Sequence, residues 1–176
     1  MNRLNGKIII VTGGSLGIGK ATCKEIAREG ATVIITDIMD DEGVKLRDEI
    51  ISEGNKAVYY NLNVTEEKEV KKVFEKVIKE YGKIDGLVNN AGISGVNKPT
   101  HEISEDEWEK VMNVNVKGVF LCTKHVIPFM KRQKKGSIIN LSSIYGIISA
   151  PDIPRYHASK GAVRLMTKTD AIMYAK

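Results

Sequence analysis

Short runs of apolar, β-branched residues alternate along the chain with longer segments in which apolar positions recur every three or four residues. The runs are typical of β-strands and the longer segments of amphipathic helices. The stretches IIIV (8–11) and VIIT (33–36) are almost entirely apolar, as expected for strands that are buried on both faces of a sheet. The predicted strands are Lys7–Thr12, Thr32–Asp37, Lys56–Asn61, Asp85–Asn89 and Ser137–Ser143.

The predicted helices fill the spaces between these strands. Three of them are followed by glycine, and the pattern SEDE (104–107) is a capping box that opens the longest one. Strict alternation of strands and helices predicts an α/β fold, namely a doubly wound, Rossmann-type parallel sheet in three α/β/α layers. The predicted helices are Gly17–Glu29, Asp40–Glu53, Glu66–Tyr81, Ser104–Gln133, with a bend, and Tyr156 to the end.

Composition narrows the class of protein. The 176 residues, 42% of them hydrophobic, are enough for one globular domain over 1–176 with a real core. The net charge of +5 arises from lysines that alternate with glutamates on helical faces, so no nucleic-acid partner is expected. No apolar run approaches the length of a membrane span, and no signal peptide is recognisable, so a cytoplasmic protein is expected.

The residues that most often bind metals are scattered. Cys23 and Cys122 are far apart in the sequence, each within a helical pattern, and the three histidines lack the spacing of a ligand set. We expect buried thiols in a reducing compartment and no metal site.

The stretch VTGGSLGIGKA (11–21) places four glycines within seven residues, between the first strand and the first helix. Strand, glycine turn and helix N-terminus form the geometry that binds a pyrophosphate. Gly13 would allow the tight turn, Gly17 the approach of the phosphate, and Gly19 the close contact of helix and strand. The spacing differs from the G-x-G-x-x-G fingerprint, so an ordinary glycine-rich turn is the alternative.

Asp37 strengthens the dinucleotide hypothesis. It ends the second strand, twenty positions after Gly17, where an acid can accept hydrogen bonds from both ribose hydroxyls and repel a 2′-phosphate. Neither Leu16 nor Ile38 offers a positive charge for that phosphate. The sequence therefore predicts NAD as the cofactor rather than NADP, with a turn or capping acid as the alternative role for Asp37.

These motifs, in this order, resemble the short-chain dehydrogenase/reductase (SDR) family over essentially the whole chain. TGGSLGIG is similar to the cofactor motif, NNAG (89–92) to the motif after the fourth strand, and NVNVKG carries an asparagine at position 115. SIINLSS precedes YHASK, which is similar to the Tyr-x-x-x-Lys of the family. The resemblance implies an oxidoreductase with the catalytic residues Asn115, Ser143, Tyr156 and Lys160.

The chemistry of the last two residues can also be argued directly. Tyr156 and Lys160 are four positions apart and would share one helix face. A nearby ammonium favours the phenolate and lowers the pKa of a tyrosine, which can then accept the proton of an alcohol. Ser143 would stabilise the charge that develops on the substrate oxygen. Ser142 competes for this role, and the spacing found in the family favours Ser143.

Other roles are implied by the resemblance alone. Lys160 would also hold the nicotinamide ribose, and Asn115 would hold a water that relays the proton through Lys160, with a bend in the long helix as its alternative role. Asn63 stands where the family often has Asp, and its amide oxygen would accept a hydrogen bond from the adenine. The cofactor-binding set is Gly13, Ser15, Gly17, Ile18, Gly19, Asp37, Asn63, Val64, Asn90, Ala91, Gly92, Tyr156 and Lys160.

The expected reaction is hydride transfer between NAD and a small-molecule secondary alcohol, of the cyclic kind, or its ketone. Ile144, Tyr145, Ile147 and residues 94–96 would line an apolar substrate pocket. A ketoacyl reductase of the same family and a non-catalytic NAD-binding protein are the alternatives. The resemblance further implies a homodimer or homotetramer formed through the last two helices, and C-terminal strands and a substrate loop that this sequence does not include, so that the chain is expected to be a fragment.

Overall fold

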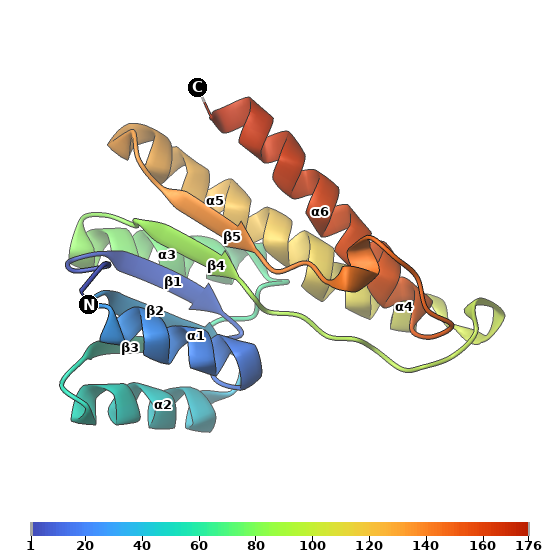
Figure 1. Ribbon diagram of the computed structural model, residues 1–176, viewed down its shortest axis with the longest axis horizontal. Coiled ribbons are helices and arrows are strands. Elements are labelled where there is room, and N and C mark those ends of the chain that lie inside the picture. The colour runs from blue at the N-terminus through green and yellow to red at the C-terminus, as the bar shows by residue number, and fades with distance from the viewer. Residues whose placement is uncertain (1, 176) are drawn as a thin grey trace.

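The computed structural model describes residues 2–175 and shows one five-stranded parallel sheet between two layers of helices (Figure 1). The strand order is β3-β2-β1-β4-β5. The strands are β1 (Ile8–Thr12), β2 (Thr32–Asp37), β3 (Lys56–Asn61), β4 (Gly86–Asn89) and β5 (Ser137–Asn140). The α-helices are α1 (Gly17–Arg28), α2 (Asp40–Ser52), α3 (Glu67–Tyr81), α4 (Glu105–Met112), α5 (Gly118–Gln133) and α6 (Pro154–Tyr174).

This order confirms the doubly wound Rossmann-type fold. β1 lies at the centre, where Ile10 pairs with Ile34 of β2 and Leu87 of β4. The chain first winds outward to β3 and then crosses back to β4, which leaves a topological switch point between β1 and β4 at the carboxyl ends of the strands.

Two hydrophobic clusters fill the space between the sheet and its helices. In the first cluster, α1 and α2 pack on one face of the sheet, where Cys23 and Leu46 contact the side of β1 and β2 that carries Val33 and Ile35. In the second, α3 and α5 cover the other face, with Phe74 among its buried residues. Alternating residues of each strand thus point into one cluster or the other. This explains why the strands are apolar at nearly every position.

The long predicted helix is not one regular α-helix. α4 passes into α5 through a π-helical turn, η2 (Asn113–Lys117), which contains Asn115. The capping box is present as predicted, because Ser104 accepts a hydrogen bond from the Glu107 backbone and Glu107 bonds back to Ser104. The extra residue of this turn shifts the face that α5 presents relative to α4.

The predicted fifth strand, Ser137–Ser143, is too long by three residues. β5 ends at Asn140, opposite Asn89, which is the last residue of β4. Beyond it the chain turns toward α6, where the Ser142 hydroxyl donates to the carbonyl of Lys160. Ser143 then starts the 3-10 turn η3 (Ile144–Gly146). The strand stops because its neighbour stops and because α6 offers other hydrogen-bond partners.

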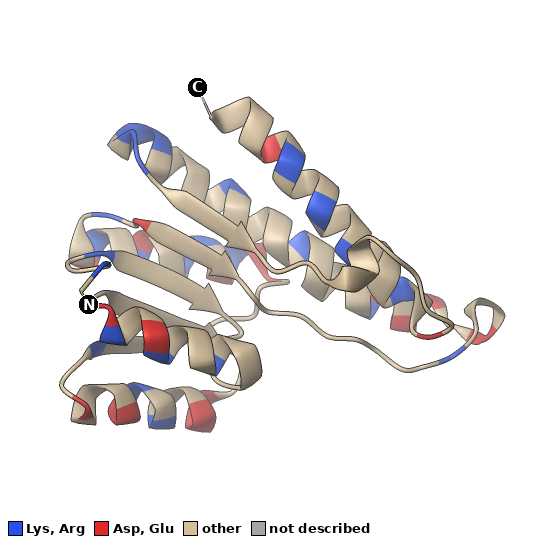
Figure 2. Ribbon diagram, in the orientation of Figure 1, with Lys and Arg blue, Asp and Glu red and all other residues tan. Residues whose placement is uncertain are grey.

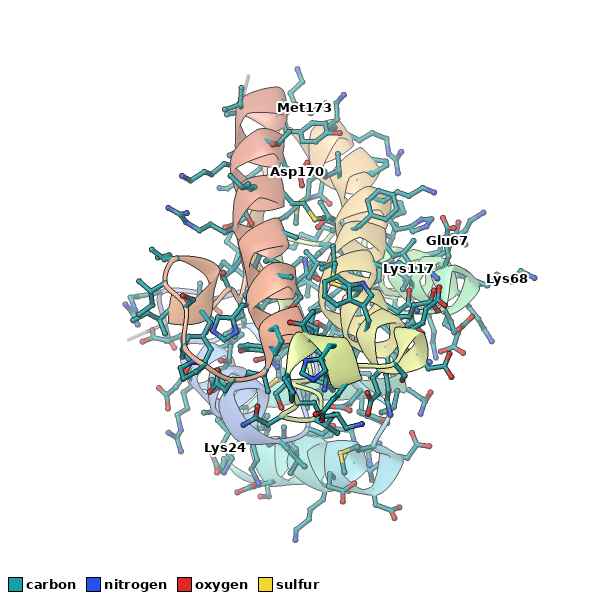
Figure 3. All side chains as sticks on the ribbon, turned by 90° about the vertical axis from the view of Figure 1, so that its right-hand side faces the viewer. Lys24, Glu67, Lys68, Lys117, Asp170 and Met173 are labelled. Carbon is teal, nitrogen blue, oxygen red and sulfur yellow. The ribbon has the colours of Figure 1, made fainter. Side chains whose placement is uncertain are left out.

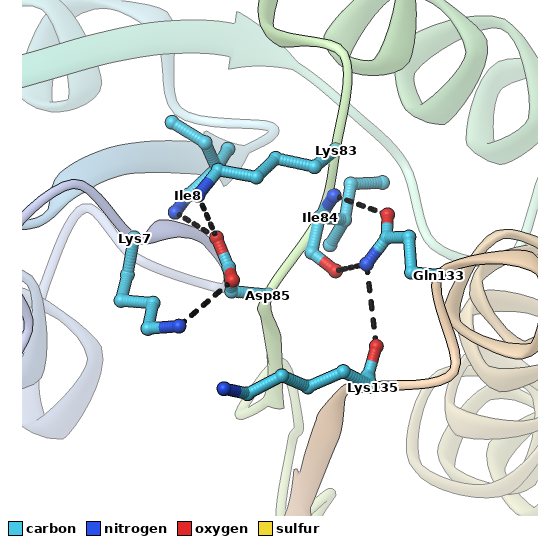
Figure 4. Close-up of polar contacts among 7 residues, drawn as sticks. All are labelled: Lys7, Ile8, Lys83, Ile84, Asp85, Gln133 and Lys135. Carbon is cyan, nitrogen blue, oxygen red and sulfur yellow. Dashed lines mark hydrogen bonds and ion pairs between the residues drawn. The ribbon is translucent and has the colours of Figure 1, made fainter.

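Two polar side chains hold the amino end of β4 (Figure 4). The Asp85 carboxylate accepts from the backbone N–H of Ile8 at 2.9 Å and pairs with Lys7 and Lys83, each at 3.1 Å. Gln133, the last residue of α5, exchanges two hydrogen bonds with the backbone of Ile84. These contacts fix the register of β4 beside β1 and connect it to the end of α5.

Charged residues lie on the outward faces of the helices and in the loops, and the strands carry almost none (Figure 2). Cys23 and Cys122 are both buried, one on each face of the sheet, and burial raises the pKa of each thiol to about 12. Within residues 2–175, no helix is both long and apolar enough to cross a membrane.

Candidate active site

A cleft of about 790 Å³ opens at the carboxyl ends of β1, β2 and β4, over the switch point of the sheet. Ligands of doubly wound folds bind at this place. It brings together most of the residues that the sequence singled out. Those that line it are Gly13, Gly17, Ile18, Asp37, Asn63, Val64, Asn90, Ala91, Gly92, Tyr156 and Lys160.

The turn between β1 and α1 forms one wall of the cleft. Gly13 and Gly17 have φ angles of 61° and 53°, a region that L side chains rarely adopt. A Cβ atom at Gly19 would collide with the carbonyl oxygen of Gly13, so the helix packs directly against the turn. Among the described residues no side chain caps the start of α1, which leaves its first N–H groups available to an anion. The turn therefore fits a pyrophosphate.

Residues at the end of β4 hold this turn in place. The Asn90 side chain donates to the carbonyls of Thr12 and Gly13, at 3.0 and 2.8 Å. The Thr12 hydroxyl in turn accepts from the backbone N–H groups of Asn90 and Ala91, both at 3.1 Å. The NNAG segment thus holds the glycine turn in place, and the Asn90 side chain forms hydrogen bonds within the protein.

Asp37 stands at the end of β2, on the side of the cleft where an adenosine ribose would lie. Its carboxylate accepts from the backbone N–H groups of Ser15 at 3.0 Å, of Ile38 at 2.8 Å and of Met39 at 3.3 Å. The Ser15 side chain is buried, and its hydroxyl has no partner among the described residues. Leu16 and Ile38, both half-exposed or more, flank the carboxylate, so this end of the cleft contains no cation to receive a 2′-phosphate.

Asn63 is arranged differently from the expectation. Its side-chain oxygen accepts from both the backbone N–H and the hydroxyl of Thr65, at 3.1 and 2.9 Å. An amide oxygen has two lone pairs, and both are engaged in this turn. Asn63 therefore lines the cleft beside Val64, but its oxygen is not available to an adenine amine in this arrangement.

Tyr156 and Lys160 enter the opposite end of the cleft from the first turns of α6. The ammonium of Lys160 lies 5.5 Å from the centre of the Tyr156 ring and donates to the carbonyl of Leu141 at 2.7 Å. Burial lowers the pKa of Lys160, because the charged form is desolvated. A hypothetical Cβ at Gly92 would lie 3.6 Å from the Lys160 nitrogen, so the end of β4 and α6 meet closely here.

The two adjacent serines differ in what their hydroxyls do. Ser142 lines the cleft, but its hydroxyl donates to the backbone carbonyl of Lys160 at 2.8 Å. Ser143 lies next to the lining and accepts from the backbone N–H of Tyr145 at 3.2 Å. The Ser143 hydroxyl proton is thus available, whereas that of Ser142 is committed to the fold.

Asn115 is buried behind the cleft in the π-helical turn and does not line it. Its amide exchanges two hydrogen bonds of 2.8 Å with the backbone of Ile93 and donates to the Ser159 hydroxyl at 3.0 Å. Ser159 in turn donates to the carbonyl of Tyr156 at 2.8 Å. Asn115 therefore ties the loop after β4 to the helix that carries Tyr156.

The expected apolar pocket is only partly formed by the predicted residues. Ser94 lines the cleft, and Tyr145 meets the Tyr156 ring edge-on, with the ring centres 6.3 Å apart. Ile144 and Ile147 are exposed and lie outside the lining.

Sequence reasoning missed several contributors. Met39, Leu62, Ile93, Lys110, Val114, Leu141 and Ile153 also line the cleft. Most are apolar residues that a periodicity argument assigns to the core. Arg155 is completely buried. The one sequence signal for it is its position directly before the YHASK motif.

Comparisons with known proteins agree on one family. The profile of the family described as short chain dehydrogenase matches residues 7–176. The cyclopentanol dehydrogenase of Comamonas sp. (strain NCIMB 9872) is 44% identical over 172 residues, which are 98% of this chain and 68% of that protein. The 3-oxoacyl-acyl-carrier-protein reductase FabG of Thermotoga maritima is 47% identical over 167 residues, or 95% of this chain and 68% of the reductase.

A solved structure extends the likeness to three dimensions. The crystal structure of NAD+-bound xylitol dehydrogenase superimposes with a TM-score of 0.95 at 34% sequence identity. The superposition covers 98% of this chain and 66% of that one. The chain thus spans about two thirds of the length of the proteins it matches.

Proposed function

Since this chain belongs to the short chain dehydrogenase family, we propose that it supplies the NAD-binding and catalytic part of an alcohol dehydrogenase. The reaction would be hydride transfer between a secondary alcohol and NAD. One observation carries the proposal: Tyr156 and Lys160 face the same cleft as the glycine turn and Asp37. The pair proposed to accept the proton and the turn proposed to bind the dinucleotide thus line one cleft.

Some residues of the cleft would bind the cofactor, and others would transfer the proton. The first turn of α1 would hold the pyrophosphate, Asp37 the adenosine ribose, and Lys160 the nicotinamide ribose. NAD, when bound, would accept hydride from the carbon that bears the substrate hydroxyl. Tyr156 would take the hydroxyl proton as a positioned base, with the Lys160 ammonium 5.5 Å from the centre of its ring. Ser143 would donate a hydrogen bond to the substrate oxygen as the charge on that atom changes.

The proposed role of Asn115 follows from its contacts. The amide fixes Ile93 at the cleft wall and, through Ser159, the backbone at Tyr156. Any water that carries the proton onward from Lys160 would depend on this arrangement.

The substrate class is inferred from a relative and from the cleft. The cyclopentanol dehydrogenase is 44% identical, and the walls near Tyr156 include apolar residues such as Ile93, Val114 and Ile153. A compact, uncharged cyclic secondary alcohol suits such walls better than a charged one.

The decisive test compares binding and turnover in one variant. Replacing Tyr156 by Phe should lower kcat for cyclopentanol oxidation by about 10²–10⁴-fold, the usual contribution of a positioned acid or base. The dissociation constant for NAD, measured by calorimetric titration, should change little, because the glycine turn and Asp37 are untouched. Tyr81→Phe, at the end of α3, is the matched control and should behave as the wild type. Turnover in Tyr156→Phe within a few-fold of wild type would show that the mechanism is wrong.

Two other functions would give different results in the same experiments. A 3-oxoacyl reductase, favoured by the 47% identity to FabG, would reduce a β-ketoacyl thioester and leave cyclopentanol unchanged. A non-catalytic NAD-binding protein would bind NAD but turn over neither substrate. The presence of both Tyr156 and Lys160 in the cleft argues against a non-catalytic NAD-binding protein.

We also propose that two copies of the protein associate through α5 and α6. These helices run beside one another on the face seen in Figure 3, with Asp170 and Met173 toward the outer end of α6. A groove between them is lined mainly by apolar side chains, including the half-exposed Phe120 and the exposed Leu165. Apolar patches of this kind mark protein–protein contacts more often than free surface.

A further inference from the structure

Arg155 is a buried cation that forms no ion pair among the described residues. Its side chain is 0% exposed, and within residues 2–175 no carboxylate lies within ion-pair distance of it. Its Nε and Nη1 atoms have no hydrogen-bond partner among the described residues. The residue also lies in the first turn of α6, where the helix dipole disfavours positive charge. Buried charges are normally paired, so this arrangement calls for an explanation.

The contacts of Arg155 are with the loop that follows β4. Its Nη2 donates to the backbone carbonyl of Val96. Gly95, with a φ of +75°, lies so close that a Cβ atom there would come within 2.5 Å of the Arg155 Nε. The backbone of the loop thus rests directly on the guanidinium group, and a glycine is what permits the approach.

The rest of this loop is held at both of its ends. Asn115 binds the backbone of Ile93, and Lys98 pairs with Glu107 at 2.7 Å. The positive charge of Arg155 also acts on Glu107 and helps to lower the pKa of that carboxyl, after the larger effects of its contacts with Lys98 and Ser104. Arg155 contacts the middle of the loop, at Gly95 and Val96.

The loop has a direct connection to catalysis. Ile93 and Ser94 line the same cleft as Lys160 and Tyr156, and Ile153, just before Arg155, lines it as well. The backbone N–H of Ile153 donates to the side chain of Asn97 at 3.3 Å. The loop of residues 93–98 and the start of α6 therefore form one wall, and Arg155 lies between its two halves.

We propose that Arg155 is a positioning residue that sets the substrate wall of the cleft relative to Tyr156. This rests on the proposed function for the identity of the reaction, although the contact itself does not. The guanidinium holds the backbone of the loop at Val96, so that residues 93–96 stand at a fixed distance from the catalytic helix. It acts through the loop, and its side-chain contacts are with Gly95 and Val96, which are not among the residues proposed to hold NAD.

The test separates the shape of the loop from the folding of the protein. In Arg155→Met, amide hydrogen exchange of residues 93–98 should increase by about tenfold or more, since a hydrogen bond from a charged donor is lost. Exchange in the glycine turn, residues 12–19, should stay unchanged, as should the dissociation constant for NAD. Arg164→Met, nine residues along the same helix, is the matched control and should alter none of these. Unchanged exchange in the loop of Arg155→Met would overturn the proposal.

Kinetics with NAD and cyclopentanol give the second readout. Arg155→Met should raise KM for the alcohol by about tenfold or more and leave kcat within about threefold, and Arg155→Lys should recover part of the loss because one donor remains. A fall in kcat with unchanged KM would point to a merely structural role and overturn the proposal. If wild-type protein does not oxidise the alcohol, the proposed function fails, while the exchange measurement still decides the role of Arg155.

A third variant covers the case in which Arg155→Met does not fold. Gly95→Ala keeps the charge and displaces the loop from the guanidinium, so it should raise exchange in residues 93–98 and raise KM in the same direction. A folded Gly95→Ala protein with wild-type exchange and KM would likewise count against the proposal.

Discussion

At the scale of single residues, the site depends on which polar atoms the fold uses and which it leaves to a ligand. The hydroxyl of Ser142 is committed to the Lys160 carbonyl, whereas Ser143 keeps a free proton. The Asn63 oxygen is committed to Thr65. Asp37 accepts from three backbone N–H groups and still borders the open cleft. A carboxylate has about four acceptor sites, so one remains for a ribose hydroxyl.

The charge of Asp37 should decide between the two nicotinamide cofactors. Asp37→Asn keeps an acceptor for the Ser15 N–H but removes the negative charge that repels a 2′-phosphate. We expect the ratio of NADP to NAD dissociation constants to fall by about tenfold or more, because hydrogen bonds to charged groups are worth ~1.5–3 kcal/mol. Competitive calorimetric titrations measure both constants.

Asp40→Asn provides the control for that prediction. Asp40 lies three residues further on and accepts from Tyr59 and Asn61 outside the cleft, so its charge should not affect the ratio. If Asp37→Asn and Asp40→Asn changed the ratio of dissociation constants equally, Asp37 would act only through its contribution to the general surface charge.

At the scale of elements, the geometry of the cleft depends on how neighbouring segments end. β4 and β5 stop at the same level, and the residues beyond them supply Gly92 and Ser143. The amino end of β4 is held by Asp85. Burial alone would raise the pKa of Asp85, but the hydrogen bond from Ile8 and the ion pairs with Lys83 and Lys7 together outweigh it, so the pKa is lowered.

Asp85 should therefore give the protein a pH-dependent part of its stability. A carboxyl with a lowered pKa in the folded state stabilises the fold above its unfolded pKa of about 3.9 and loses that effect as the pH falls through the folded value. Asp85→Asn should lower the free energy of unfolding at pH 7 by about 1–2 kcal/mol. The difference from wild type should shrink below about pH 4. Urea unfolding at several pH values measures it.

Asp48→Asn is the matched comparison for Asp85. Asp48 lies on the exposed side of α2 and pairs with Arg47 with 61% of its side chain exposed, so its loss should be almost neutral. A pH-independent deficit in Asp85→Asn would show that packing, rather than charge, accounts for its role.

At the scale of the whole molecule, the two faces of the sheet are covered unequally at the β5 side. α5 and α6 leave a groove of about 940 Å³ between them, bordered by exposed apolar residues near the end of α6. Tyr156 and Lys160 belong to this same helix. An association through α5 and α6 would therefore stabilise the helix on which catalysis is proposed to depend.

A charge placed in this groove should prevent the association of two copies. Leu165 is 62% exposed, so Leu165→Glu should hardly alter the thermal stability of a single chain while it lowers the mass observed in sedimentation velocity to that of one copy. Ile51→Glu, at a comparably exposed apolar position on α2, should leave the mass unchanged. A wild-type protein that sediments as a single copy would contradict the proposed association.

By itself, the sequence determined the features that depend on local patterns. Alternating apolar runs and helical periods predicted the order and type of the strands and helices, apart from the π-helical turn that divides the longest predicted helix, because burial on two faces leaves a recognisable pattern. The glycine turn, the acid at the end of the second strand and the i, i+4 relation of Tyr156 and Lys160 were likewise visible. Each involves residues whose spacing along the chain sets their spacing in space.

Only the tertiary structure decided what depends on residues distant in the sequence. The end of β5 was set by β4 and α6, the availability of Ser143 by the contact between Ser142 and Lys160, and the place of Asn115 by Ile93 and Ser159. Arg155 shows the difference most clearly, since its neighbour in the fold is a loop some sixty positions earlier. Hydrogen-bond partners of buried polar groups are chosen by packing, and no local pattern encodes them.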